Sequence, residues 1–224
     1  MTVTIYDTLE QGSPEWLQAR CGILTASVIG KLITPTLKVA DNDTARSIIA
    51  TLAAERITGD VDYVHPTFDM QRGHDDEPVA RALYAEHFHD VAEVGFIIRE
   101  ETTYRLGYSP DGVVGDHGLL EIKSRRPKVH VQTVLADRPP AENVAQLQAG
   151  LFVTGRKWID YCSYSPGLPM WVQRVYPDPA WQTVIEQAAT VFEERVNHMV
   201  DTFNTATAGM PPTEPRVDLE EIRI

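Results

Sequence analysis

The sequence predicts an α/β or α+β fold in which a central mixed sheet is flanked by helices. Three observations favour it: the order of helical and strand patterns, a composition of 43% hydrophobic and 23% charged residues, and no internal repeat. A chain of 224 residues suits one hydrophobic core with extensions. We therefore expect a single domain over residues 1–204 and an acidic, proline-rich tail over residues 205–224.

The first third of the chain is typical of helices joined by turns. A hydroxyl at Thr25 or Ser27 can cap the amides of a helix that Pro35 ends, and Gly59 ends the helix after it. The expected elements here are a turn at 12–15, a short segment at 16–20, helices at 25–34 and 43–57, and a loop at 60–68.

The middle of the chain combines one helix with several strands. Asp75 and Asp76 precede Glu77 and Pro78, and a proline in the first turn is a common helix start, so we expect a helix from there to about residue 89. Ser109-Pro110-Asp111-Gly112 is a strong turn signal between strand patterns. The expected strands cover residues 91–99, 103–108, 113–114 and 119–123.

The last part predicts a helix, two strands and a long helix. The first helix covers residues 140–153, with Gly155 as its C-cap, and strands follow at 158–164 and 170–176. The second helix covers residues 181–203 and carries one apolar stripe. The stripe consists of Trp181, Val184, Ile185, Ala188, Phe192, Val196, Met199 and Phe203.

Charge and cysteine content exclude several classes of protein. Cys21 and Cys162 are too few for a disulfide framework, a four-cysteine iron–sulfur cluster or a cysteine-rich zinc site. No segment approaches the roughly 20 apolar residues of a membrane span, and no signal peptide is recognisable, so we expect a cytoplasmic protein with no membrane contact. The net charge of −12 argues against a uniformly basic surface for nucleic acid but leaves room for a local basic groove.

The residues around the central turn carry the strongest chemical signal. If the strands on either side of residues 115–118 pair, the carboxylates of Asp111 and Glu121 converge. Glu121 and Lys123 share one strand face, while Ile122 points into apolar packing and its carbonyl stays near. Carboxylates and a carbonyl suit Mg²⁺ or Mn²⁺, and a lysine beside them can position or deprotonate an attacking water. Each piece alone is also an ordinary turn or ion pair, but their joint occurrence favours metal-assisted phosphodiester hydrolysis.

Pro110-Asp111 followed by Glu121-Ile122-Lys123 resembles the PD-(D/E)xK nuclease motif. The wider chain resembles one branch of that superfamily, the phage lambda-type exonucleases, also called YqaJ-like viral recombinases. The resemblance implies a restriction-endonuclease-like core that forms a single nuclease domain over residues 1–204. It covers roughly residues 12–169.

An N-terminal signature supports the same resemblance. Trp16-x-x-x-Arg20-x-Gly22-x-x-Thr25-Ala26-Ser27 matches the family pattern at the same spacing. The resemblance implies that Arg20 and Ser27, with Thr25 beside them, receive the 5′-phosphate of a DNA end. An arginine just before a helix start is a suitable anion site, although a surface ion pair and a simple cap would give the same residues.

Two further segments match the family. Gly73-x-x-x-Glu77-Pro78-x-Ala80-Arg81 implies that Glu77 is a metal ligand together with Asp111, Glu121 and the Ile122 carbonyl. Ala145-Gln146-Leu147-Gln148 implies that Gln146, rather than Gln148, joins Lys123 in the site. The chain departs from the family after the lysine, where Arg125 and Arg126 stand; they either contact DNA or lie in a solvated loop.

The resemblance implies a metal-dependent 5′-to-3′ exonuclease that digests linear double-stranded DNA and leaves 3′ single strands for phage-type recombination. It further implies Mg²⁺, or Mn²⁺, with two ions per site, a ring-shaped homotrimer, a single-strand annealing protein as partner, and a phage or prophage origin in a bacterial host. A PD-(D/E)xK endonuclease and a non-catalytic DNA-binding assembly subunit stay open as alternatives. For the exonuclease we expect an acidic exterior around a basic lining built from Arg20, Lys123, Arg125 and Arg126.

Overall fold

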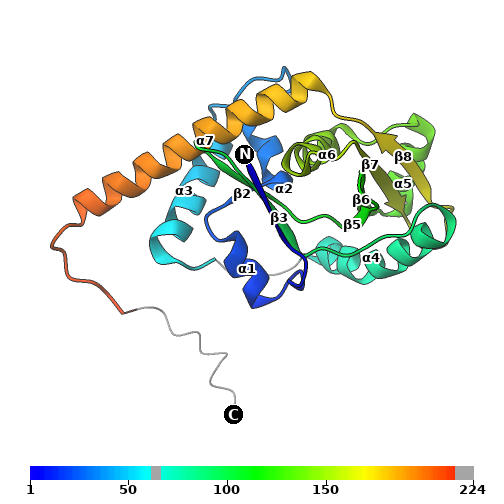
Figure 1. The fold of residues 1–224 in the computed structure, drawn as a ribbon, viewed down its shortest axis with the longest axis horizontal. Helices are drawn as coiled ribbons and strands as arrows, with labels where there is room; N and C mark the ends of the chain where they lie inside the picture. The colour runs from blue at the N-terminus through cyan, green and yellow to red at the C-terminus, as the bar shows by residue number, and fades with distance from the viewer. Residues whose placement is uncertain (62–66, 215–224) are drawn as a thin grey trace, which may run out of the picture.

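The structure is a computed structural model that describes residues 1–61 and 67–214 (Figure 1). Seven α-helices and two mixed four-stranded sheets make up the described chain, which confirms the predicted fold class. The expected central sheet is therefore divided into two. Parts of the expected loop at 60–68 and of the expected tail lie outside the described residues, and the division into domain and tail stays a prediction.

The first sheet has the strand order β1-β3-β4-β2. Its pairs are antiparallel except for β2 and β4, which run parallel. The strands are β1 (Thr2–Tyr6), β2 (Leu24–Thr25), β3 (Phe96–Glu100) and β4 (Arg105–Tyr108). β1 was not predicted, because it is a short edge strand that is mostly exposed and has few apolar residues to form a clear alternation.

The second sheet has the strand order β5-β6-β7-β8, and only its central pair, β6 and β7, is parallel. The strands are β5 (Gly112–Val114), β6 (Gly118–Ser124), β7 (Trp158–Tyr164) and β8 (Trp171–Val175). The main chain of Ala92, before β3, exchanges two hydrogen bonds of 2.9 and 2.8 Å with that of Val113 on β5. They connect the approach to β3 with the start of the second sheet.

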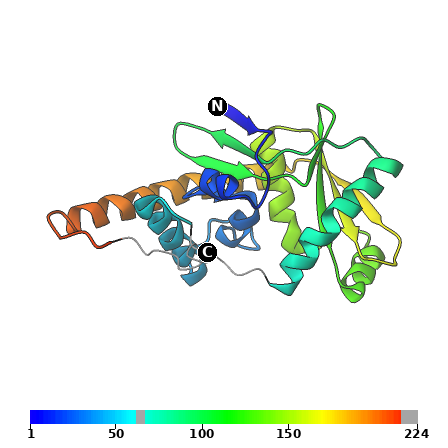
Figure 2. The same cartoon turned by 90° about the horizontal axis from the view of Figure 1, so that it is seen from below.

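Helices cover both sheets (Figure 1; Figure 2). They are α1 (Pro14–Arg20), α2 (Ala26–Ile29), the 3₁₀ turn η1 (Gly30–Leu32), α3 (Asp43–Thr58), α4 (Phe68–His87), α5 (Pro127–Ala136), α6 (Ala141–Thr154) and α7 (Pro179–Ala206). Most of α6 is buried, so this helix forms the centre of the main core. The C-terminal end of α7 projects beyond the rest of the fold in both views. Among the described helices, none is long and apolar enough to cross a membrane.

The predicted start of α4 is wrong. The helix begins at Phe68, because the Thr67 hydroxyl accepts a hydrogen bond from the Met70 N–H at 3.2 Å and caps it there. Pro78 therefore lies inside α4, where the missing N–H and the ring cost about 3 kcal/mol. Hydrogen bonds from α4 to the second sheet offset this cost, one of them a buried 2.6 Å bond from the Tyr84 hydroxyl to Asp160.

The segment after the predicted catalytic lysine is not the solvated loop that was one of its two predicted alternatives. It enters α5, with Pro127 at the first helical position. This helix was not predicted, because the basic residues before it and in its first turn obscure the helical pattern of the sequence. The predicted apolar stripe of the last helix is confirmed in its central part, where Val184, Ile185, Ala188, Phe192 and Val196 are buried.

Candidate active site

The β5–β6 hairpin brings the predicted carboxylates together. Gly112 on β5 pairs with Leu120 on β6, so Asp111 at the strand end comes beside the middle of β6. One carboxylate oxygen of Asp111 accepts a hydrogen bond from the Ile122 N–H at 2.5 Å. The expected convergence of Asp111 and Glu121 through this turn is thus confirmed.

The alternation along β6 separates the site from the core. Glu121 and Lys123 share the face toward α6, whereas Ile122 packs into an apolar cluster on the opposite face. The other members of that cluster are Ala80, Tyr84, Val114, Leu120 and Cys162. Because Ile122 is only 6% exposed, its side chain fixes the strand while its main chain stays at the site.

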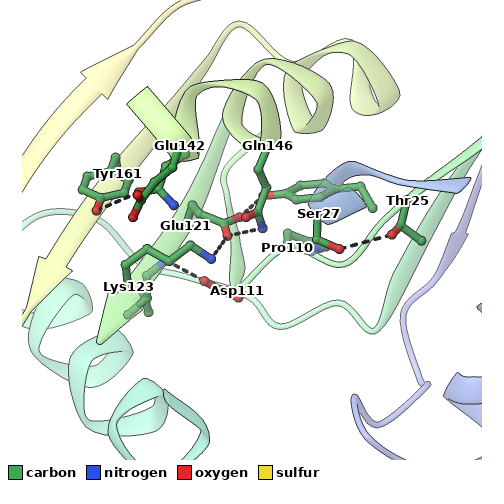
Figure 3. A network of polar contacts seen from close by, with 12 residues as sticks. Thr25, Ser27, Pro110, Asp111, Glu121, Lys123, Glu142, Gln146 and Tyr161 are labelled. Carbon is green, nitrogen blue, oxygen red and sulfur yellow. Dashed lines mark hydrogen bonds and ion pairs between the residues drawn. The ribbon is translucent and has the colours of Figure 1, made fainter. Parts of the chain in front are cut away.

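The Glu121 side chain is the most densely bonded group of the site (Figure 3). One oxygen accepts from Lys123 Nζ at 2.6 Å and from Gln146 Nε2 at 2.5 Å, and the other accepts from the Tyr108 hydroxyl at 2.8 Å. Gln148, by contrast, is buried away from the site and bonds the Tyr176 carbonyl. The choice of Gln146 over Gln148 agrees with this geometry, and Tyr108 is an addition that its position next to the turn could have suggested.

Glu77 reaches the site from inside α4 and not from a helix start. Arg81, one turn further on, donates a short hydrogen bond to the Glu77 carboxylate and a 2.7 Å bond to the Asp111 carbonyl. The N-terminus of α4 does not lie beside Glu77, because the helix begins nine residues earlier at Phe68. Arg81 instead holds the Glu77 carboxylate and links α4 to the central turn.

Burial and neighbouring negative charge raise the pKa values of two acids of the site, Asp111 and Glu77. Burial, then the charge of Glu121, raises the pKa of Asp111 well above its usual range. Burial also raises the pKa of Glu77, although Arg81 opposes it. Burial opposes protonation of Lys123, but the charges of Glu121 and Asp111 outweigh it and raise its pKa, so Lys123 is an ammonium. The site holds more negative charge than its own cations compensate.

The oxygen ligands of these residues suit a hard divalent cation. Carboxylates and the Ile122 carbonyl are the ligand types that Mg²⁺ prefers. Burial, and then the charge of Glu121, raise the pKa of Asp111, and a bound cation would oppose this shift. The described chain contains no preformed group of three or more His, Cys, Asp or Glu side chains arranged around one ion. The reason is visible in the contacts, because Glu77 binds Arg81 and Glu121 binds Lys123.

Arg20 lies at the end of α1 and is held by an aromatic ring and a hydroxyl. Its guanidinium carbon is 3.9 Å from the centre of the Trp16 ring, and Nη1 donates to Ser109 Oγ at 3.3 Å. The Trp16 indole N–H donates to the same hydroxyl at 3.0 Å. Burial lowers the pKa of Arg20 to about 10, and the opposing charge of Glu55 does not restore it. This arginine is a desolvated cation.

Thr25 and Ser27 lie beside Arg20 without acting as helix caps. Their hydroxyl oxygens are 3.2 Å apart, and Thr25 occupies the N-cap position of α2. Within the described structure its side chain makes no capping hydrogen bond, so the prediction that one of these hydroxyls caps the helix is wrong. The helix is only four residues long, and both hydroxyls keep their bonding capacity for the space in front of them.

One cavity of about 840 Å³ unites the predicted residues. Its lining includes Arg20, Thr25, Ser27, Glu77, Asp111, Ile122, Lys123 and Gln146. Glu121 lies just behind this wall, with a side chain 1% exposed, and acts through its contacts. Residues that lie far apart in the sequence, from Arg20 to Gln146, thus line one cavity. The Arg20 guanidinium lies at one part of it, and the acids lie at another.

Arg125 and Arg126 are absent from the described residues that line this cavity. Arg125 points toward α6 and is 17% exposed, whereas Arg126 is 62% exposed and pairs with Asp69 at 2.9 Å. The expected basic lining of four residues is therefore reduced to Arg20 and Lys123. The sequence could not show this, because the direction of each side chain depends on how the strand enters α5.

Comparison with solved structures gives the same fold. The crystal structure of an alkaline exonuclease (LHK-Exo) from Laribacter hongkongensis is 32% identical, with a TM-score of 0.79, and the match covers 89% of this chain and 100% of that one. Its complex with dAMP matches equally well. A phage-related exonuclease from Haemophilus somnus matches with a TM-score of 0.59 at 12% identity, over 81% of this chain and 96% of that one, and shows the fold alone.

Comparison of sequences points the same way. No curated protein matches the chain. The family described as the YqaJ-like viral recombinase domain matches residues 15–157, which include both the Arg20 signature and the Asp111–Lys123 hairpin. Because this match spans more than half of the chain and agrees with the structural neighbours, the chain belongs to the YqaJ-like viral recombinase family and has the PD-(D/E)xK fold of phage-type exonucleases.

Proposed function

We propose that this protein is a metal-dependent exonuclease that digests linear double-stranded DNA from 5′-phosphorylated ends in the 5′-to-3′ direction. The observation that carries the proposal is the single cavity in which Arg20 and Ser27 share a space with Asp111 and Lys123. A terminal phosphate bound at Arg20 would place the next phosphodiester along the cavity, toward the acids. Digestion then leaves 3′ single strands of the kind that phage-type recombination uses.

Glu77, Asp111, Glu121 and the Ile122 carbonyl would hold Mg²⁺ or Mn²⁺, two ions per site. When bound, such ions activate water and stabilise the leaving oxygen of a phosphodiester. Glu77 and Glu121 would exchange part of their bonding to Arg81 and Lys123 for the ions. The excess negative charge around Asp111 supports this assignment.

The side chains of the chain itself would orient the reaction. Lys123 and Gln146, both bonded to one Glu121 oxygen, position the attacking water and offset the charge that develops on the phosphate oxygens. Water adds to phosphorus and the 3′ oxygen of the terminal nucleotide leaves with a proton. The products are a deoxynucleoside 5′-monophosphate and a strand with a new 5′-phosphate. The dAMP complex of the Laribacter hongkongensis enzyme is consistent with a product of this class.

Family likeness supports the wider biological setting. We propose a ring-shaped homotrimer that encloses the duplex, a single-strand annealing protein as partner, and a phage or prophage gene expressed in the cytoplasm of a bacterial host. Thr25 and the exposed Arg126 are proposed as further DNA contacts.

The experiment compares four linear or closed substrates with the full-length protein. Duplexes with 5′-phosphate or 5′-hydroxyl ends, a 3′-labelled duplex and a closed circle are incubated with Mg²⁺ or EDTA. We expect mononucleotides only from linear duplexes, faster with 5′-phosphate and absent in EDTA. Cutting of the closed circle would favour an endonuclease, and no cutting of any substrate with Mg²⁺ or Mn²⁺ would favour a non-catalytic subunit.

A further inference from the structure

The three residues after Lys123 join β6 to the two helices that complete the site. Ser124 Oγ donates to Asp76 of α4 at 2.6 Å and accepts from Arg72 Nε at 3.0 Å. Arg126 contacts Asp69, also on α4. Arg125, between them, turns the other way, toward α6. One short segment therefore ties the helix of Glu77 and the helix of Gln146 to the strand of Lys123.

The Arg125 guanidinium lies between the first turn of α6 and β7. Nη2 donates to Asn143 Oδ1 at 2.5 Å and to the Tyr161 hydroxyl at 3.3 Å, and Nη1 donates to Glu142 at 3.4 Å. Glu142 and Tyr161 lie on the left in Figure 3, and Thr25 and Ser27 on the right. The arginine is thus committed to protein acceptors away from the DNA-facing wall.

The bonding of Arg125 reaches Gln146 through one helical turn. Asn143 and Gln146 are three residues apart on α6 and so lie on neighbouring positions of the same face. The start of α6 lacks a side-chain cap in the described structure, because Pro140 occupies the N-cap position. The grip of Arg125 on Asn143 and Glu142 therefore fixes a helix start that has little else to hold it.

Stability alone gives a poor account of this arginine. Arg125 Nε is buried and finds no hydrogen-bond partner among the described residues, and an unpaired buried donor is costly. Replacing a whole buried set of paired charges by apolar side chains of similar volume is often neutral or stabilising. A residue retained at such a cost is better explained by the geometry that it imposes.

We propose that Arg125 is a positioning residue, which places Gln146 against Glu121 through Asn143, and is not a DNA contact. This inference rests on the proposed nuclease function. Loss of the guanidinium lets the first turn of α6 shift, so the Gln146 amide loses its alignment with the attacking water. Its effect should therefore fall on the rate of hydrolysis and leave the affinity for DNA unchanged.

The test compares Arg125→Met with Arg46→Met, a matched change of an exposed arginine on α3 that pairs with Asp41 and Asp43. Single-turnover rates are measured with saturating linear duplex and Mg²⁺, affinities for the same duplex are measured in EDTA over a range of salt, and melting temperatures are recorded. A displacement of about 1 Å in an active site can cost about a hundredfold in rate, so we expect Arg125→Met to lower the rate about 10- to 100-fold. Its affinity should remain that of the wild type. Its melting temperature should fall by a few degrees, because the groups that Arg125 holds at the start of α6 lose a partner, with the protein still folded at the assay temperature. Arg46→Met should keep the wild-type rate.

A double variant shows whether Arg125 acts through Gln146. Arg125→Met combined with Gln146→Ala should be no slower than Gln146→Ala alone, and Arg125→Lys, which keeps a donor for Asn143, should recover part of the rate. Multiplicative losses in the double variant would overturn the inference. So would a wild-type single-turnover rate for Arg125→Met with weaker binding and a salt slope reduced by about one, the signature of a lost phosphate contact.

The outcomes separate this inference from the proposed function. If the wild-type protein digests no substrate, the proposed function fails. If the wild type digests DNA and both Arg125→Met and Arg125→Lys keep its full rate, only the positioning role fails. Should Arg125→Met not fold, Arg125→Lys and Asn143→Ala carry the test, with the same requirement that neither adds to Gln146→Ala.

Discussion

The two ends of the cavity hold charge in opposite ways. At the Glu121 end, a buried carboxylate is matched by Lys123, Gln146 and Tyr108 at 2.5–2.8 Å. At the Arg20 end, a desolvated guanidinium stacks on an aromatic ring and meets a hydroxyl. The first arrangement fixes groups for bond breaking, and the second keeps a cation ready for an incoming anion. The first end should thus control rate, and the second should control which DNA end is captured.

The largest expected effect is at the Glu121 end. Lys123→Ala should lower the single-turnover rate about 10²- to 10⁴-fold, the usual range for a positioned proton-transfer or charge-stabilising group. Binding of 5′-phosphorylated duplex in EDTA should stay within about a few-fold of wild type, because the effect is confined to the chemical step. Lys128→Ala on α5 is the matched control. A Lys123→Ala protein that digests at the wild-type rate would break the division between the two ends.

A smaller effect is expected at the Arg20 end. Arg20→Met should weaken binding of 5′-phosphorylated duplex about 10- to 100-fold, because a hydrogen bond to a charged group contributes about 1.5–3 kcal/mol. Binding of the 5′-hydroxyl duplex should change much less, so the preference between the two ends disappears. Arg46→Met on α3, an exposed arginine paired with Asp41 and Asp43, serves as control. Equal loss for both duplexes would show that Arg20 does not read the terminal phosphate.

The smallest effect is one of stability in the metal-free protein. Burial and the charge of Glu121 raise the pKa of Asp111, so the folded state binds more protons than the unfolded state. Stability in EDTA should therefore fall as pH rises above the ordinary carboxyl pKa of about 3.9 and level off above the raised folded value. Asp111→Asn should flatten this dependence and raise the melting temperature at pH 8 by about 2–4 °C per kcal/mol of relieved repulsion. Melting curves in EDTA from pH 4 to 9 measure it, and an unchanged slope in Asp111→Asn would contradict the assignment.

Local sequence signals located the hydrolytic end well. The turn at residues 109–112 and the alternation of Glu121, Ile122 and Lys123 are set by short-range geometry. The hairpin, and the strand face on which each side chain lies, could therefore be predicted from the sequence alone. The gathering of Arg20 and Ser27 near Asp111 depends on long-range packing. Only the family resemblance, and not periodicity, indicated it.

Other features could not be predicted from the sequence, because local signals compete there or because distant segments decide the structure. Pro78 gave a strong helix-start signal, but the Thr67 cap begins α4 earlier and contacts along the helix tolerate the proline. The positions of Arg125 and Arg126 depend on the entry into α5, which no single residue specifies. The division of the sheet into two follows from pairings across distant segments, such as β1 with β3.

The central place of β6 has a consequence for how this protein tolerates change. The strand pairs with β5 over Gly118–Leu120 and along its whole length with β7, so an extra residue would break the register with a neighbour. One inserted residue between Gly118 and Glu121 would turn Glu121 and Lys123 into the apolar cluster and Ile122 toward α6. Residues 115–117 lie between the paired strands, so a longer turn there would leave the register of β6 unchanged. Lineages of this protein should accordingly vary in length at the hairpin tip while the spacing from Gly118 to Lys123 stays invariant.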